Sequence, residues 1–185
     1  MKRYIVLIGK TASGKDVFAK YLKDKYDIPS VRFSDAIFQV AKEQGLVTNE
    51  EASKEKLQEL GNVLRARIGE FFYTGYVIEK AREVNGDFCV INGLRHQGEL
   101  HYLEKRLPNS LILAGIVSDK EKRFERAKGI GMVSTKDDFE KLEDNEAEKN
   151  IDALLEKVRF KIENNNGLKE FCKRIDNLLK ELDIR

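Results

Sequence analysis

The fold is decided by the stretch Tyr4-Ile5-Val6-Leu7-Ile8-Gly9-Lys10-Thr11-Ala12-Ser13-Gly14-Lys15-Asp16. Its first five residues form a continuous apolar run, which is typical of a strand buried on both faces of a sheet. The next seven fit G-x-x-x-x-G-K, in which glycines let backbone N–H groups converge on phosphate oxygens and the lysine adds a positive charge. A helical pattern over 16–26 follows directly, so its positive dipole end faces the loop. A strand, such a loop and a helix in this order predict a phosphate-binding site.

Four more short strands are predicted along the chain, and helical patterns separate them. Apolar runs predict strands over 88–91 and 111–117, a short strand is expected over 29–33, and the alternation of Val158, Phe160 and Ile162 predicts the last one. The clearest helical patterns cover 53–69, 70–84, 98–106, 119–128 and 138–156. Strands that alternate with helices pair in parallel through crossover connections. The sequence therefore predicts an α/β fold, a doubly wound five-stranded parallel sheet, in one domain over 1–185.

The composition limits the class of protein. The chain has 185 residues, enough to bury a core without staples, and only two cysteines, which favours a reducing, cytoplasmic compartment. Its 34 basic residues nearly cancel its 32 acidic ones, so bulk charge favours neither a nucleic-acid nor a membrane partner. No apolar run approaches the roughly 20 residues of a membrane span. We therefore expect a small-molecule ligand.

One position departs from the full phosphate-loop pattern. Asp16 follows Lys15, where Ser or Thr would offer a hydroxyl to magnesium. A carboxylate can hold magnesium directly or through water, since hard cations favour oxygen ligands. Asp16 can equally stabilise the first helical turn against the dipole. The sequence leaves these two readings open.

Several further segments, taken with the loop, resemble the P-loop kinases of the nucleoside and deoxynucleoside monophosphate kinase superfamily. They cover most of the chain in the family's order. The segments are Phe33-Ser34-Asp35-Ala36-Ile37, Leu57-Gln58-Glu59-Leu60-Gly61 with Arg65, Val90-Ile91-Asn92-Gly93-Leu94-Arg95 with Glu99, the pair Arg123 and Arg126, and 164–167. Dephospho-CoA kinases and phosphomevalonate kinases are related look-alikes.

The resemblance implies a nucleotide-kinase type of P-loop fold. It implies a helical acceptor-binding region at about 40–85 and a short lid at about 123–140. The implied activity is transfer of the γ-phosphate of ATP, with Mg²⁺, to a small monophosphate such as a nucleoside or deoxynucleoside monophosphate. Transfer to a ribose hydroxyl, as in dephospho-CoA kinases, and ATP binding without catalysis are the alternatives.

The resemblance also assigns roles to individual residues. Lys15 is expected to touch the β- and γ-phosphates, which the backbone from Gly9 to Asp16 cradles. Guanidinium forks match phosphate oxygens, so arginines are expected to clamp the acceptor phosphate and the transferred group. These arginines are Arg65, Arg95 and, from the lid side, Arg126. The remaining nucleotide contacts are assigned to Arg123, Asn165 and Gly167.

Two polar residues carry open alternatives. Asp35 is expected to orient or deprotonate the acceptor, or to bind magnesium through water; alternatively Ser34 or Asp35 caps the next helix. Asn92 stands where the family usually has Asp near magnesium. We hypothesise that Asp16 and Asp35 supply the missing charge.

The remaining polar and aromatic groups carry weaker expectations. The aromatic cluster Phe71, Phe72, Tyr73 and Tyr76 is expected to be mostly core, with one or two rings free to stack on an acceptor base. The acidic stretch 137–148 is expected to be a solvated helix face.

Overall fold

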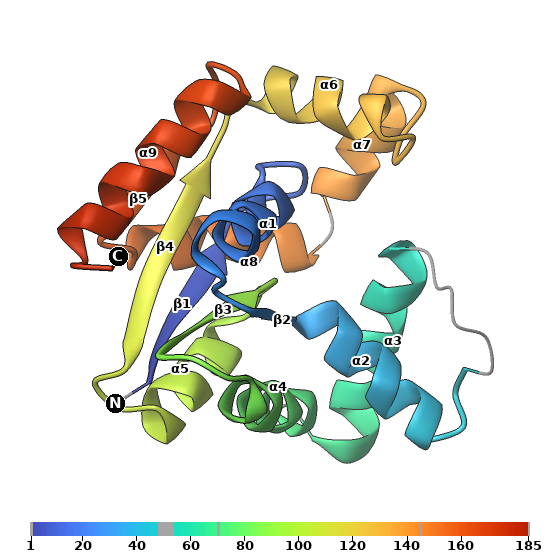
Figure 1. The fold of residues 1–185 in the computed structure, drawn as a ribbon. Coiled ribbons are helices and arrows are strands. Elements are labelled where there is room, and N and C mark those ends of the chain that lie inside the picture. Colours follow the sequence, from blue (N-terminus) through green and yellow to red (C-terminus); the bar gives the residue numbers. More distant parts are fainter. Residues whose placement is uncertain (1, 48–53, 70, 145, 185) are drawn as a thin grey trace.

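The computed structural model describes residues 2–47, 54–69, 71–144 and 146–184. Within them, a single sheet holds five parallel strands in the order β2-β3-β1-β4-β5 (Figure 1). The strands are β1 (Arg3–Ile8), β2 (Ser30–Arg32), β3 (Phe88–Asn92), β4 (Leu111–Val117) and β5 (Phe160–Glu163). The predicted five-stranded parallel α/β fold is confirmed.

Helices connect the strands and cover the sheet on both faces. The first four are α1 (Lys15–Tyr26), α2 (Phe33–Glu43), α3 (Lys54–Ile68) and α4 (Phe72–Glu83). The others are α5 (Gln97–Arg106), α6 (Lys120–Gly129), α7 (Lys136–Glu143), α8 (Glu146–Glu156) and α9 (Leu168–Glu181). The α2–α3 pair and the α6–α7 pair project on either side of α1 (Figure 1).

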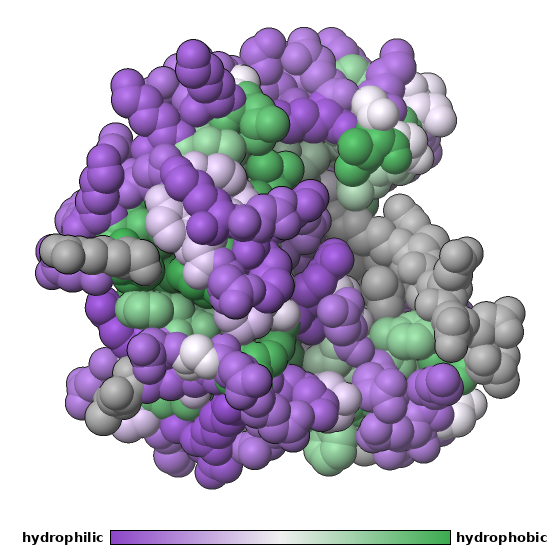
Figure 2. Space-filling view, in the orientation of Figure 1, coloured by the Kyte–Doolittle hydropathy of each residue, from purple (hydrophilic) through white to green (hydrophobic). Residues whose placement is uncertain are grey.

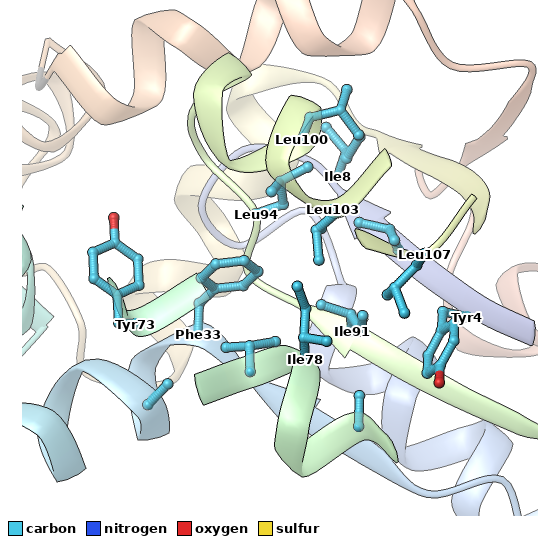
Figure 3. Close-up of a cluster of buried hydrophobic side chains, with 14 of the residues drawn as sticks. Tyr4, Ile8, Phe33, Tyr73, Ile78, Ile91, Leu94, Leu100, Leu103 and Leu107 are labelled. Atoms are coloured by element: carbon cyan, nitrogen blue, oxygen red, sulfur yellow. The ribbon is translucent and has the colours of Figure 1, made fainter. Parts of the chain in front are cut away.

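Strand β1 divides the core in two, because successive side chains of a strand point to opposite faces. Tyr4, Val6 and Ile8 face a cluster completed by side chains of α2 to α5 and α8. Figure 3 shows part of this cluster, with the rings of Phe33 and Tyr73 toward one end and Tyr4 at the other. On the opposite face, side chains of α1 and α9 pack over the sheet. Central β1 is therefore a rigid support for the loop that follows it.

Helices α6 and α7, in the segment predicted to form a lid, share a small core. Ala127 of α6 and Phe139 of α7 are buried together with Val133 and Leu142, and these four residues are called the α6–α7 cluster. Ala12 of the phosphate loop packs against this cluster, so α6 and α7 contact the loop through apolar side chains.

Two expectations about helices are wrong. Helix α2 begins at Phe33, and Ser34 and Asp35 lie in its first turn instead of capping it. Burial of Phe33, whose ring meets Tyr73 edge-on at 6.1 Å, sets this start.

The predicted helix over 138–156 is two helices, α7 and α8. Phe139 of α7 packs in the α6–α7 cluster, whereas Ile151 and Leu154 of α8 pack in the main core. One straight helix cannot place side chains in both clusters, so the helix is interrupted between α7 and α8, although no glycine or proline in the sequence signals this.

Candidate active site

The loop of residues 9–14 leaves the carboxyl end of β1, which lies between β3 and β4. Ligands of open parallel sheets bind at this edge. Two glycines are required here. A Cβ on Gly9 would lie 2.6 Å from the carbonyl oxygen of Ile116. Gly14 has φ +114°, and a Cβ there would collide with the side-chain amide of Asn164. The strand, the loop and the helix therefore stand in the predicted arrangement.

Lys15 begins α1 and folds back across the loop. Its Nζ donates to the carbonyl oxygens of Gly9 (2.6 Å) and Lys10 (2.9 Å). Lys10 itself pairs with Asp152 of α8 at 2.8 Å. The ammonium group of Lys15 is thus held at the mouth of the loop, where a phosphate would meet it.

The last third of the chain braces the loop from outside. The Asn164 side chain donates from Nδ2 to the carbonyl of Ser13 at 2.8 Å. Arg126 donates to the carbonyl of Ala12 at 3.4 Å, to the hydroxyl of Ser118 at 3.0 Å and to the carbonyl of Asn164. Burial lowers the pKa of Arg126.

Arg123 braces the same loop and is almost fully buried, with 5% of its side chain exposed. It forms a two-point ion pair with Glu143, at 2.6 and 2.7 Å. It also donates to the carbonyls of Ser118 (3.2 Å) and Thr11 (3.4 Å). The structure thus places Arg123 and Arg126, both assigned to the nucleotide or the reaction, on backbone carbonyls of the loop.

A second buried glutamate meets the loop from the other side. Glu148, in the first turn of α8, is fully buried and accepts from the Thr11 backbone N–H at 2.8 Å and the Thr11 hydroxyl at 2.6 Å. The same carboxylate forms an ion pair with Arg95, which lies in the segment after β3. Arg95 retains 19% side-chain exposure. Arg95, which the resemblance assigns to the transferred group, is therefore connected to the phosphate loop through the carboxylate of Glu148.

A third glutamate links Arg65, which the resemblance assigns to the acceptor, to Arg95. Glu99 of α5 lies 3.5 Å from the guanidinium of Arg65 and accepts from the Tyr73 hydroxyl at 2.5 Å. Its other oxygen accepts the backbone N–H groups of Arg95 (3.0 Å) and His96 (3.1 Å). Burial, reinforced by the charge of Glu99, raises the pKa of Tyr73. Glu99 thus links the Arg65 guanidinium to the backbone of Arg95, a role for which the sequence analysis did not single it out.

Of the three polar residues expected near magnesium, Asp16 and Asn92 are in contact, whereas Asp35 contacts neither of them. Asp16 is 72% exposed at its side chain, accepts from Asn92 Nδ2 at 2.8 Å and lies 3.5 Å from Arg32. Asn92 Oδ1 is buried without a hydrogen-bond partner. The described residues hold no group of three or more His, Cys, Asp or Glu suited to a metal. Magnesium commonly uses one or two carboxylates together with substrate phosphates and waters, so Asp16 fits that requirement.

Asp35 is exposed on α2 and has no hydrogen bond or ion pair with Asp16 or Asn92 among the described residues. In the described part of the chain, the hydroxyl of Ser34, at 3.2 Å, is the hydrogen-bond donor to its carboxylate. It lines a hollow of about 410 Å³ between β2, α2 and α4, together with Arg32 and Tyr76.

The remaining candidates have structural contacts. Asn165 accepts from the Ser118 hydroxyl (3.0 Å) and the Asp119 backbone N–H (2.9 Å), joining the segments after β4 and β5. Gly167 is the N-cap of α9. Of the aromatic cluster, only Tyr73 is buried, and Tyr76 packs partly buried against the main core. Phe71 is partly buried and stacks on Tyr102 at 5.2 Å, whereas Phe72 is 50% exposed, so the expectation of core packing is wrong for Phe72.

The expectation of a solvated acidic face over 137–148 is wrong for Glu143 and Glu148. Both carboxylates form ion pairs with arginines, and the side chain of Glu148 has no exposed surface. A signal was available, since Glu148, Ile151 and Leu155 follow one another at i, i+3 and i+7, the spacing of an apolar helix face. An acid on such a face is a candidate for a buried ion pair.

Figure 2 shows the surface hollowed between the α6–α7 pair and the α2–α3 pair. None of the helices among the described residues has the length and apolar character needed to cross a membrane.

Comparisons with known proteins agree with this architecture. No protein-family model matches the chain. A UPF0200 protein of Methanosarcina barkeri is 25% identical over 180 residues, which cover 96% of this chain and 94% of that protein. Among solved structures, TT1252 from Thermus thermophilus has a TM-score of 0.70 at 18% identity, covering 98% of both chains. Shikimate kinase from Aquifex aeolicus has a TM-score of 0.53 at 17% identity, covering 97% of this chain and 96% of that one. The chain therefore has a P-loop kinase-like fold.

Proposed function

We propose that this chain is a phosphotransferase that moves the γ-phosphate of ATP to a small acceptor carrying a phosphate, with nucleoside and deoxynucleoside monophosphates as the leading class. The observation that carries the proposal is the continuous set of contacts from Arg65 through Glu99 to Arg95 and from Arg95 through Glu148 to Thr11. These contacts fix Arg95 next to the loop through Glu148 and connect Arg65 to the segment that carries Arg95, which supports a reaction between a donor in the loop and an acceptor at Arg65.

Phosphoryl transfer leaves the protein mainly positioning and charge stabilisation to perform. In the proposed reaction, backbone N–H groups of the loop and Lys15 hold the donor phosphates. Arg65 binds the acceptor phosphate, because a guanidinium matches phosphate oxygens in geometry and charge. Arg95, between that arginine and the loop, stabilises the negative charge of the group in transfer.

Asp16 would hold Mg²⁺, with the side chain of Asn92 oriented beside it. When bound, the ion neutralises charge on the donor phosphates. The contact between Asp16 and Asn92 supports the hypothesis that Asp16 supplies the carboxylate that Asn92 lacks. Asp35 does not share that contact, so its proposed role is confined to the acceptor.

A hydroxyl acceptor is the second candidate. Asp35 is exposed and has no basic partner among the described residues, so its carboxylate is free to accept a proton from a hydroxyl. An acceptor phosphate is already ionised near neutral pH and needs no such base. Asp35→Asn therefore separates the candidates: turnover falls strongly for a hydroxyl acceptor and little for a phosphate acceptor.

The direct test is a panel of acceptors incubated with ATP and Mg²⁺, with ADP formation as the measurement. ADP that appears only with nucleoside monophosphates supports the proposal. ADP that appears with dephospho-CoA supports the hydroxyl candidate. Tight ATP binding without ADP under any condition contradicts both. Lys15→Ala is the site control, because it should abolish ATP binding whichever reaction is correct.

A further inference from the structure

Glu148 is a fully buried carboxylate next to a phosphate loop, where negative charge opposes the binding of phosphate. Burying an ionised carboxylate is costly unless its charge is paired and its oxygens are hydrogen-bonded. Both conditions hold here: Oε2 accepts from the backbone of Thr11, and Oε1 accepts from the Thr11 hydroxyl and from Arg95. The question is what an acid in this place contributes.

The helix that carries Glu148 is a fixed part of the core. Ile151 and Leu154, on the next turns of α8, have no exposed surface. The carboxylate itself is inaccessible, so an incoming phosphate cannot reach it without moving the helix. These facts argue against a placeholder that the nucleotide displaces and favour a permanent support.

Arg95, in contrast, is only partly committed. Within the described chain, Glu148 is the one acceptor bonded to its guanidinium, through NH1. Arginine has five N–H donors. The remaining donors lack a protein acceptor among the described residues, and 19% of the side chain is exposed. One edge of the guanidinium is therefore fixed, and the other is open to a ligand.

We propose that Glu148 is a positioning residue that fixes Arg95 against the phosphate loop and presents its free edge to the terminal phosphate of the bound nucleotide. This inference rests on the proposed function for its catalytic meaning, but its effect on nucleotide binding does not require turnover. The protein should therefore prefer ATP over ADP, and that preference should depend on Glu148 only when Arg95 is present.

The experiment is a double-mutant cycle of Glu148→Gln and Arg95→Met in the full chain, with the dissociation constants of ATP and ADP measured by calorimetry. Glutamine removes the charge that pairs with Arg95 and puts an amide donor in place of one of the two acceptor oxygens. Three donors, two from Thr11 and one from Arg95, then meet a single uncharged acceptor, so at least one of these hydrogen bonds is lost and the bond to Arg95 is weakened. Each single variant should reduce the preference for ATP by about tenfold or more, the value of a hydrogen bond to a charged group. The double variant should be no worse than Arg95→Met alone.

Three outcomes overturn the proposal. The first is an unchanged ATP preference in Glu148→Gln, and the second is an unchanged preference in Arg95→Met. The third is a Glu148→Gln loss that is equally large in the Arg95→Met background, which would make Glu148 a support for the loop alone. Glu156→Gln, the same chemical change at an exposed glutamate two turns further along α8, is the matched control and should leave the preference unchanged.

Arg95→Met leaves the Glu148 charge unpaired and can impair folding. Thr11→Val then replaces it in the test, because it removes a Glu148 contact without touching Arg95. The proposal requires a smaller loss of ATP preference in Thr11→Val than in Glu148→Gln, and an equal loss overturns it. A wild-type protein that forms no ADP with any acceptor contradicts the proposed function, whereas these binding ratios still decide the role of Glu148.

Discussion

Two arginine–glutamate pairs flank the phosphate loop, and they differ in what they leave unused. Arg123 and Glu143 meet at two points, and the same guanidinium also binds two backbone carbonyls. Arg95 meets Glu148 at one point and keeps an exposed edge. The same residue types therefore support the loop on one side and leave a guanidinium accessible to a ligand on the other. The two arginines differ in how many of their N–H donors are already hydrogen-bonded to the protein.

Arginine-to-lysine substitution should chiefly lower turnover at Arg95 and chiefly lower stability at Arg123. The larger effect is expected at Arg95. Arg95→Lys keeps a positive charge for Glu148, so the protein should stay folded. It removes the planar fork that a phosphate requires, so turnover should fall by about 100-fold or more. Steady-state ADP formation measures this, with thermal unfolding as the control. Normal turnover would mean that Arg95 is a brace as well.

Arg123→Lys should chiefly lower stability. Lysine cannot match the two-point pair with Glu143 and the carbonyls together, and losing charge-assisted hydrogen bonds in a buried site costs about 2 kcal/mol. Urea unfolding gives this value directly. The ATP dissociation constant of the folded variant should change less than that of Arg95→Lys, and the reverse order would break the contrast between the two sites.

A smaller, pH-dependent effect on stability is expected at Tyr73, whose hydroxyl donates to Glu99 of the third arginine–glutamate pair, Arg65 and Glu99. The pKa of Tyr73 is higher in the folded protein than in the unfolded chain, because burial disfavours the phenolate beside Glu99. The folded state therefore binds this proton more tightly, and stability is lost as pH rises above the ordinary tyrosine value near 10.0, by up to about 1.4 kcal/mol per pH unit. Unfolding at pH 8 to 11 should show a steeper decline in the wild type than in Tyr73→Phe. Parallel curves would contradict this assignment.

The smallest effect is expected at Arg32 and Asp16, which lie 3.5 Å apart with both side chains largely exposed. Exposed ion pairs contribute little because water and salt screen them. Arg32→Gln should change the free energy of unfolding by no more than about 0.5 kcal/mol. A change like that expected for Arg123→Lys would show that burial is not what separates these pairs.

The sheet could be predicted from the sequence because its three central strands, β1, β3 and β4, are largely apolar runs and because β5 alternates apolar and charged residues. The loop could be predicted because Gly9 and Gly14 are local requirements. The helix boundaries at Phe33 and between α7 and α8 could not, since they follow from which cluster each side chain enters. Tertiary packing overrides a local capping signal in the first case and an unbroken helical pattern in the second.

The sequence singles out the cations of the candidate site but not its buried glutamate. Lys15 ends the glycine motif, Arg95 follows a strand end, and Arg65 is assigned by resemblance. Glu148 does not stand out, because a glutamate among lysines looks like solvated surface until the helix is packed. Its partner Thr11 lies 137 residues away, a separation that no local pattern reports.

The braces on the loop come from late in the chain, and this has a consequence for biosynthesis. The loop is complete in sequence by residue 15, yet its carbonyls and N–H groups are held by Arg126, Glu148 and Asn164. A nascent chain that has exposed the whole glycine motif still lacks these supports. Competence to bind nucleotide should therefore arise only once the chain has left the ribosome beyond residue 164, so nucleotide capture by a nascent chain reports that all three supports have emerged.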